Sequence, residues 1–276
     1  MKTPINLIHI TDLHFFSYGL APSHFLSKRI LGYVNWVLNR SKRFDFSSKD
    51  KFLAYLRNAK PKGVIISGDF TVTSDDREFE LARRFTDEIK SLSIPVYIIP
   101  GNHDYYTFES VRRKRFEFFF KDYLISEEYP YSVRIDDNLT VIFLHTVRPN
   151  FLSSRGVISK EQVEKLGEMI ATNKTPVIVC GHYPILHKTD TYYSNATRRL
   201  KGARFLRKVI VQAQTSLLYI AGHVHHYSYT VDRDNSRVSY LTTPPLFYRK
   251  DKEGGFCEIT LCGEDFKIKF HLLPEL

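Results

Sequence analysis

A chain of 276 residues, 43% of them hydrophobic and 25% charged, has an ordinary globular composition, and we expect one domain over residues 1–276. It has no run of about 18 apolar residues, and polar residues interrupt the N-terminus early, so we predict neither a membrane-spanning helix nor a signal peptide. Three unevenly spaced cysteines exclude a disulfide framework and favour a cytoplasmic location. The net charge of +10 indicates an anionic partner, such as a nucleotide, nucleic acid or acidic lipid.

Short apolar runs bounded by turn residues predict buried strands that end just before Thr11, Gly68, Gly101, His145, Gly181 and Gly222. Helical patterns cover residues 76–91, 107–121, 159–171 and 197–212. In the third pattern, Ser159 and Gln162 have the spacing of a capping box. The alternation predicts an α/β fold with largely parallel central strands. The pattern of residues 227–276 is instead typical of antiparallel strands.

The sequence predicts a basic, amphipathic helical insertion over about residues 23–43. Its apolar residues at helical spacing are Leu26, Ile30, Tyr33, Val34 and Val37, and Leu31, Trp36 and Leu38 widen that surface. No acidic residue lies between Asp12 and Asp45. One hypothesis is a helix packed on the sheet with solvated cations. The other is that residues 25–43 contact an anionic membrane surface, or form a lid for a lipid-linked substrate, at the inner membrane face.

Polar residues follow five of the predicted strands. They are Asp12 and His14, then Asp69, then Asn102, His103 and Asp104, then His182, and finally His223 and His225. Because ligands of layered α/β proteins gather at the carboxyl ends of the strands, we expect one shared site. A glycine before four of these groups allows a sharp strand exit and close backbone approach. The i, i+2 spacing of "DLH" and "HVH" suggests chelating pairs on one side of an extended segment.

Two Asp, one Asn and four His form a donor set that suits manganese, iron, zinc or cobalt rather than calcium. Any one of these histidines alone would more often be a surface or capping residue, so the prediction depends on the ordered set. Seven donors are too many for one ion with open positions, and they suit two ions about 3.5–4 Å apart that share a carboxylate. We expect two divalent ions, manganese first, with iron, zinc, cobalt or magnesium as alternatives. Such a pair generates a bridging hydroxide, so hydrolysis needs no protein nucleophile.

The ordered motifs "DLH", "GD", "GNHD", "GHYP" and "GHVH" resemble those of the calcineurin-like metallophosphoesterase superfamily over roughly residues 7–226. The segment "RGVISKEQVEKL" is similar to one in the branch that contains class III cyclic-nucleotide phosphodiesterases. The resemblance implies a four-layer α/β/β/α sandwich of two mixed sheets with a dinuclear site at their edge. It also implies that Asp12, His14 and His225 hold the first metal, that Asp69 bridges, and that Asn102, His182 and His223 complete the second.

The resemblance leaves His103 free of metal, so we predict that it stabilises the phosphoryl group or protonates the leaving oxygen. Asp104 would either orient His103 or cap the following helix. In the protein-phosphatase branch an Asp assists this histidine, and Val72 stands at the comparable place here. We predict a structural role for His9, and a place in the pocket lining or the core for His145.

The predicted function is hydrolysis of a phosphodiester or pyrophosphate bond in a small nucleotide or nucleotide-linked substrate. Four alternatives stay open: a phosphomonoesterase or protein phosphatase, a pyrophosphatase acting on a lipid-linked nucleotide sugar at the membrane surface, a nuclease, and a non-catalytic metal-binding scaffold. Predicted substrate contacts are Arg148, His187, Tyr192 and Arg198. The other basic runs lack the interleaved aromatic residues of a single-strand groove, so we expect no specific nucleic-acid partner. No oligomeric state follows from the sequence.

Overall fold

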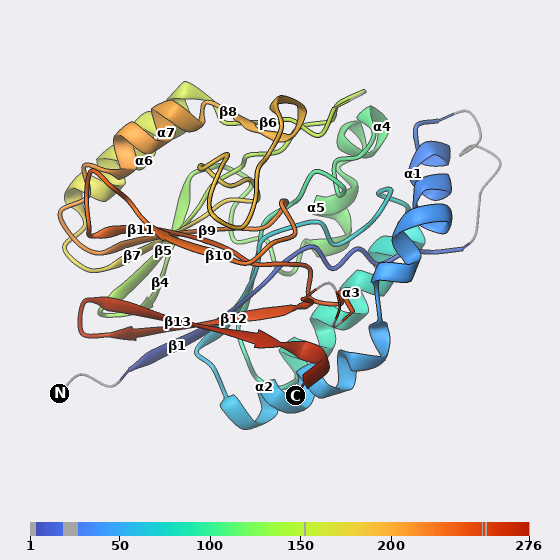
Figure 1. Ribbon diagram of the computed structural model, residues 1–276, viewed down its shortest axis with the longest axis horizontal. Helices are drawn as coiled ribbons and strands as arrows, with labels where there is room; N and C mark the ends of the chain where they lie inside the picture. Colours follow the sequence, from blue (N-terminus) through green and yellow to red (C-terminus); the bar gives the residue numbers. More distant parts are fainter. Residues whose placement is uncertain (1–3, 19–26, 152, 250, 252, 276) are drawn as a thin grey trace.

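Two β-sheets lie face to face, with helices on the outer face of each (Figure 1). The computed structural model describes residues 4–18, 27–151, 153–249, 251 and 253–275. One sheet has the strand order β13 (Asp265–Leu272), β12 (Gly255–Cys262), β1 (Ile5–Ile10), β2 (Gly63–Ile66), β3 (Val96–Ile98). The other has the order β10 (Ser228–Val231), β11 (Val238–Thr242), β9 (Leu217–Ala221), β7 (Val177–Cys180), β5 (Leu139–Phe143), β4 (Tyr131–Asp136).

Helices complete the sandwich. On the five-stranded sheet they are α2 (Lys49–Ala59), α3 (Asp76–Ser91) and α5 (Arg115–Phe120), and on the six-stranded sheet α6 (Lys160–Thr172) and α7 (Ala203–Ile210) (Figure 1). Shorter elements are α4 (Phe108–Arg112), the parallel pair β6 (Gly156–Val157) and β8 (Leu200–Lys201), and the turns η4 (Phe46–Ser48), η5 (Ala196–Arg198) and η7 (Leu273–Glu275). The predicted four-layer α/β/β/α architecture is confirmed.

Alternation along the strands builds three apolar layers. In β1, Leu7 packs between the sheets and Ile8 packs under the helices of the five-stranded sheet. In β9, Leu218 packs between the sheets and Leu217 packs under α6 and α7. Because successive side chains of a strand point to opposite faces, strands covered on both sides must be apolar throughout. This is why the short continuous apolar runs predict the strands correctly.

All six predicted strands form, and the central ones are parallel in both sheets: β1, β2 and β3 in one, and β5, β7 and β9 in the other. The C-terminal region differs in one pairing. β10 pairs antiparallel with β11, and β12 pairs antiparallel with β1 and β13, but β11 runs parallel to β9. β11 therefore extends the parallel set of β5, β7 and β9, and β10 is the antiparallel edge strand beside it.

Two predicted helices have different bounds. The pattern over 107–121 forms α4 and α5, separated at Lys114, which has φ 47°. The pattern over 197–212 forms η5, β8 and then α7, which begins after Gly202 with φ 99°. Only one of the two hydrogen bonds of the predicted capping box of α6 forms, in which Gln162 N donates to Ser159 Oγ. The Gln162 side chain instead accepts from the backbone N of His145 and donates to its carbonyl.

The basic insertion contains α1 (Arg29–Asn35), the π-helical turn η2 (Trp36–Arg40) and the turn η3 (Ser41–Arg43), and its residues 23–26 lie outside the described residues. Its buried side is not the predicted one. Trp36 stacks on Phe16 at 5.1 Å, whereas Val34 and Val37 are exposed. The periodicity showed that an apolar face exists, but the segment packs through Trp36 on the loop residues Phe16 and Phe44. Within the described residues, no helix is long and apolar enough to cross a membrane.

Candidate dinuclear metal centre

The seven predicted ligands meet at the carboxyl ends of five strands. Asp12 and His14 follow β1, Asp69 follows β2, Asn102 follows β3, His182 follows β7, and His223 and His225 follow β9. Parallel strands expose their carboxyl ends on the same edge of a sheet, so turns far apart in sequence converge there. The structure therefore brings together every residue that the sequence proposes as a ligand.

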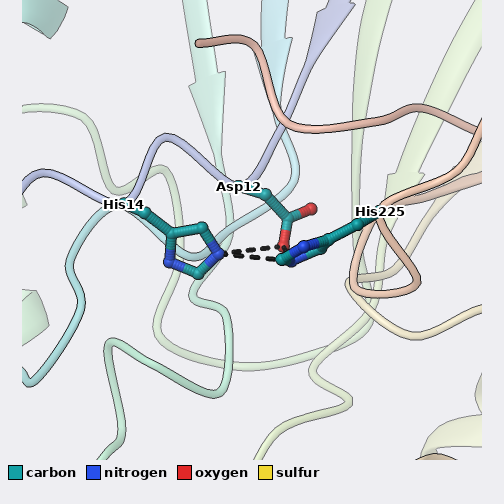
Figure 2. Close-up of side chains that lie close together, drawn as sticks. All are labelled: Asp12, His14 and His225. Atoms are coloured by element: carbon teal, nitrogen blue, oxygen red, sulfur yellow. Dashed lines mark hydrogen bonds and ion pairs between the residues drawn. The ribbon is translucent and has the colours of Figure 1, made fainter. Parts of the chain in front are cut away.

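Asp12, His14 and His225 form the first group (Figure 2). Asp12 Oδ1 lies 3.0 Å from His225 Nε2 and 3.6 Å from His14 Nε2, and it is buried without a hydrogen-bond partner. His14 Nδ1 lies 3.2 Å from the Thr71 carbonyl, which can only accept, so the proton resides on Nδ1. His225 Nδ1 lies 2.6 Å from the Tyr248 hydroxyl. His14 Nε2 and His225 Nε2 therefore both face Asp12 Oδ1, as three ligand atoms would face a cation.

The second group has the same arrangement. Asn102 Oδ1 lies 3.1 Å from His182 Nε2 and 2.8 Å from His223 Nδ1. The opposite ring nitrogens face carbonyls: His182 Nδ1 is 2.8 Å from Ser67 O, and His223 Nε2 is 3.0 Å from Arg198 O. Each of these carbonyls accepts from an outer ring nitrogen, so Asn102 Oδ1, His182 Nε2 and His223 Nδ1 are the atoms that face one point. The residues present therefore fit a second metal ion.

Asp69 lies between the two groups. Its Oδ2 is 3.8 Å from His14 Nε2 and its Oδ1 is 3.5 Å from His182 Nε2, so each oxygen faces one group, as a bridging carboxylate would. Burial opposes ionisation of Asp69, but the neighbouring His182 and His103 hold its pKa below its usual range. Burial lowers the pKa of His182, but Asp69 outweighs this effect and raises that pKa to about 9. The site thus favours positive charge beside Asp69.

Five of the predicted ligands have left-handed backbone conformations. The φ angles are 51° for Asp12, 49° for His14, 56° for Asp69, 68° for His223 and 61° for His225. Non-glycine residues rarely adopt this region, and clusters of such strained residues occur at functional sites. The prediction of extended chelating pairs is therefore wrong in its local geometry. The two pairs do face one point, but through left-handed turns rather than through the alternation of a strand.

Gly68 and Gly101 allow the loops after β2 and β3 to touch. Gly68 has φ 104°, which favours glycine. A Cβ on Gly101 would collide with the backbone N and the Oδ1 of Asp69. Close approach of these two loops is what brings Asn102 near Asp69, and the sequence prediction of that role for the glycines agrees with this geometry.

His103 stands beside the metal groups. Its backbone N donates to Asp69 Oδ1 at 2.7 Å, and its Nδ1 donates to the Val72 carbonyl at 2.5 Å. The main-chain carbonyl of Val72, rather than a side chain, is thus the acceptor for the His103 ring. His103 Nε2 lies 3.3 Å from Arg40 Nη1, so it can accept from the guanidinium. Burial, with a contribution from Arg40, lowers the pKa of His103 well below its ordinary value.

Asp104 neither contacts the His103 ring nor caps the next helix. Its carboxylate accepts from the backbone N atoms of Gly101 at 2.8 Å, Thr71 at 3.0 Å and Phe70 at 3.2 Å. The N-cap of α4 is Thr107. Burial and the neighbouring Asp69 raise the pKa of Asp104 to about 7. Its hydrogen bonds join the "GD" and "GNHD" loops. Asp104 therefore neither orients His103 nor caps the next helix, as the two sequence hypotheses proposed, but links the two loops.

Two adjoining cavities open over the site, with volumes of about 610 Å³ and 260 Å³. Asn35, Arg40, Asn102, His103, Ser154 and Arg198 line both. Of the predicted substrate contacts, Arg198 lines both cavities and Arg148 lines the smaller one. His187 instead lines separate depressions beside α7. Tyr192 is buried, and its hydroxyl donates to Leu186 O at 2.8 Å. The structure does not bring these two residues to the metal groups.

Sequence reasoning missed three residues of the site: Arg40, Arg43 and Tyr248. The cluster of cations before Asp45, in a segment without acidic residues, could have indicated a role for the two arginines. No sequence pattern indicated Tyr248. His9 is a core residue, as predicted, because its ring nitrogens contact the Ser67 and Thr243 hydroxyls between the sheets at 2.8 and 2.7 Å.

The structure has two mixed sheets with Asp, Asn and His side chains gathered in two groups at their shared edge. This arrangement is that of the dinuclear metallophosphoesterase fold class. The chain belongs to the calcineurin-like phosphoesterase family, whose model matches residues 5–227. This confirms the family suggested by the ordered motifs.

Two curated relatives carry phosphodiesterase names. The chain is 27% identical over 184 residues to a probable glycerophosphodiester phosphodiesterase, GpdQ, of Arcobacter nitrofigilis, covering 65% of this chain and 63% of that protein. It is 24% identical over 249 residues to a probable cyclic nucleotide phosphodiesterase of Colwellia psychrerythraea, covering 89% of this chain and 79% of that protein. Both are named as phosphodiesterases, and the second as a cyclic nucleotide phosphodiesterase, which agrees with the predicted branch.

Solved structures share the fold at low identity. A dimetal phosphatase from Danio rerio has a TM-score of 0.67 at 15% identity, covering 98% of this chain and 96% of that chain. Purple acid phosphatase PPD1 from yellow lupin has a TM-score of 0.63 at 12% identity, covering 100% of this chain and 52% of that chain. These likenesses concern the fold alone.

Proposed function

We propose that the protein is a dinuclear-metal-dependent phosphohydrolase that cleaves a phosphodiester or pyrophosphate bond in a small nucleotide or nucleotide-linked substrate. The family, the convergence of the seven candidate ligands, and the phosphodiesterase names of both relatives support the reaction class. Manganese is the first ion to test, with iron, zinc, cobalt or magnesium as alternatives, because mixed carboxylate and imidazole donors suit these metals.

The observation that carries the choice of a diester or pyrophosphate is the pair of cavities that meet at His103 and Arg40. A phosphomonoester has one substituent on phosphorus and would fill one cavity, whereas a diester or pyrophosphate extends to both sides. Cations line each side: Arg43 lines the larger cavity, and Lys28 and Arg148 line the smaller one. Because guanidinium groups bind phosphate oxygens with paired hydrogen bonds, a second phosphate fits this lining.

Each side chain has a role in this proposal. Asp12, His14 and His225 would hold one metal, Asn102, His182 and His223 would hold the other, and Asp69 would be shared by both. When bound, two divalent ions supply an activated water and neutralise phosphoryl oxygens. His103 and Arg40 border both cavities, so His103 Nε2 acts at the phosphoryl group or the leaving oxygen, and the Arg40 guanidinium binds a phosphoryl oxygen. Asp104 holds the loops that carry Asp69 and Asn102.

A second candidate is a pyrophosphatase acting on a lipid-linked nucleotide sugar. Leu31 and Phe151, two exposed apolar side chains that line the smaller cavity, favour it. Contact of residues 25–43 with an anionic membrane surface belongs to this candidate, and of that segment the structure describes residues 27–43.

The test is hydrolysis by the manganese-loaded protein of bis-p-nitrophenyl phosphate compared with p-nitrophenyl phosphate, followed by cyclic nucleotides, nucleotide sugars and single-stranded DNA. We expect faster turnover of the diester than of the monoester. No hydrolysis with any of the candidate metals would refute the enzyme proposal, and a preference for the monoester would refute the substrate class.

Two variants test the assignment of roles, with metal content measured by elemental analysis. His103→Ala is expected to keep two metals per chain and lose most of its rate, because the ring acts on the substrate. Asn102→Ala is expected to lose metal as well as rate. Full activity in both variants would show that the site is misplaced.

A further inference from the structure

The α1–η2 segment presents an apolar strip to solvent. Leu31 is 61% exposed and Leu38 is 65% exposed, and Val34 lies between them on the same face at helical spacing. We call Leu31, Val34 and Leu38 the outer strip. In Figure 1, α1 lies at the right edge of the molecule, outside both sheets. A single exposed leucine is normal, but successive turns of large apolar residues on one helix face are typical of an interaction surface.

The opposite side of the segment is firmly packed, so the outer strip has a defined orientation. Arg29 donates to the carbonyls of Thr73 and Ser74 and forms an ion pair with Glu109 at 3.0 Å. A Cβ on Gly32 would lie 2.9 Å from the Tyr106 hydroxyl, which shows how closely the helix approaches the body of the protein. Rotation of α1 to bury the outer strip against its own chain would break these contacts.

The outer strip adjoins the smaller cavity. Leu31 lines that cavity together with Phe151, which is 73% exposed. Lys28 and Arg148 line the same cavity, so its opening combines apolar side chains with cations. Whatever covers the outer strip therefore also lies at the entrance to the candidate site.

The charges around the strip select an anionic partner. No acidic residue lies between Asp12 and Asp45, and the exposed Lys42 and Arg43 follow the strip in sequence. An apolar face flanked by cations is typical of a helix that lies in the interface of an anionic bilayer. A second copy of the chain would bring the same cations together, and a strip of three side chains is narrow compared with the ~800 Å² per partner of a stable interface.

We propose that the outer strip, together with Phe151, docks on the surface of an anionic lipid bilayer and turns the opening of the smaller cavity toward the lipid headgroups. The substrate of the site is then a phosphate compound with a lipid anchor, and this second statement rests on the proposed function. Docking itself does not depend on catalysis.

Vesicle co-sedimentation tests the docking. We expect the wild-type chain to bind vesicles that contain phosphatidylglycerol and phosphatidylcholine at least tenfold more tightly than vesicles of phosphatidylcholine alone. The double variant Val34→Gln/Leu38→Gln, whose two positions line neither cavity, is expected to lose at least tenfold in binding. The matched control is Tyr229→Gln/Val231→Gln, which changes two exposed apolar residues of β10 and is expected to bind like the wild type.

The outcomes separate docking from function. Absence of wild-type binding to anionic vesicles, or equal binding by the Val34→Gln/Leu38→Gln variant, overturns the docking. A wild-type dimer that this variant converts to a monomer, measured by analytical ultracentrifugation, also overturns it, because a second copy then covers the strip. The variant is expected to hydrolyse soluble bis-p-nitrophenyl phosphate like the wild type. Vesicle binding by a wild type that hydrolyses no diester would support docking and refute the proposed function.

Discussion

Replacement of Arg40 by Gln tests whether the basic insertion takes part in the chemistry. Arg40 Nη1 lies 3.3 Å from His103 Nε2, and Arg40 lines both cavities. Among the described residues no carboxylate forms an ion pair with Arg40, whereas Arg29 pairs with one carboxylate and Arg207 with two. A guanidinium that borders an active site without a carboxylate partner is available for a phosphate oxygen.

The size of the effect follows from this geometry. The positive charge of Arg40 contributes to lowering the pKa values of His103 and His225, so its field reaches both the metal groups and the ring. A hydrogen bond to a charged group contributes about 1.5–3 kcal/mol. Because about 1.4 kcal/mol corresponds to a factor of ten, Arg40→Gln is expected to lower kcat/KM for a diester about 10- to 100-fold. Arg40→Lys should recover only part of the loss, because it keeps the charge but not the paired donors.

The assay is steady-state hydrolysis of bis-p-nitrophenyl phosphate with manganese, accompanied by metal analysis and thermal unfolding. Lys42→Gln is the matched control. Lys42 is an exposed residue two positions after Arg40, so its replacement removes one positive charge from the same segment. Arg40→Gln is expected to retain two metals per chain and the wild-type Tm. A kcat/KM for Arg40→Gln within threefold of the wild type, with both metals bound, would refute the assignment.

Three further predictions concern metal affinity and stability. Gly101→Ala should lose metal and about 1–3 kcal/mol of stability, because the new Cβ collides with Asp69; unchanged metal content and Tm would contradict this. Tyr248→Phe removes the hydroxyl 2.6 Å from His225 Nδ1 and should weaken metal binding about 10- to 100-fold in a calorimetric titration. Wild-type affinity in this variant would mean that another group orients His225. Burial lowers the pKa of His145 from 6.5 to about 4, so the unfolded chain takes up a proton that the folded chain excludes. The free energy of unfolding should therefore fall between pH 6.5 and pH 4 more for the wild type than for His145→Phe, and parallel curves in denaturant titrations would refute this.

The sequence alone identified the strands and the proposed ligands for a local reason. A strand covered on both faces must be apolar throughout, and a metal-ligand side chain at its carboxyl end must be polar. The segment "GVIISGD" contains both features in consecutive residues. The shared edge of the sheets then follows from the parallel direction of the strands. For this reason the amino-acid pattern predicts that all seven proposed ligands, from Asp12 to His225, lie close together.

Contacts between distant segments decided the remainder. Arg40 reaches His103 from 63 positions away, and Tyr248 reaches His225 through a loop without a motif. Asp104 contacts the loop after β2 rather than its neighbour His103, because that loop presents unpaired backbone donors. The periodicity of residues 23–43 predicted an apolar face, but only the tertiary structure showed that Trp36 is covered and Val34 exposed. A periodic pattern describes the surface of one helix, whereas burial depends on the shape of the element that packs against it.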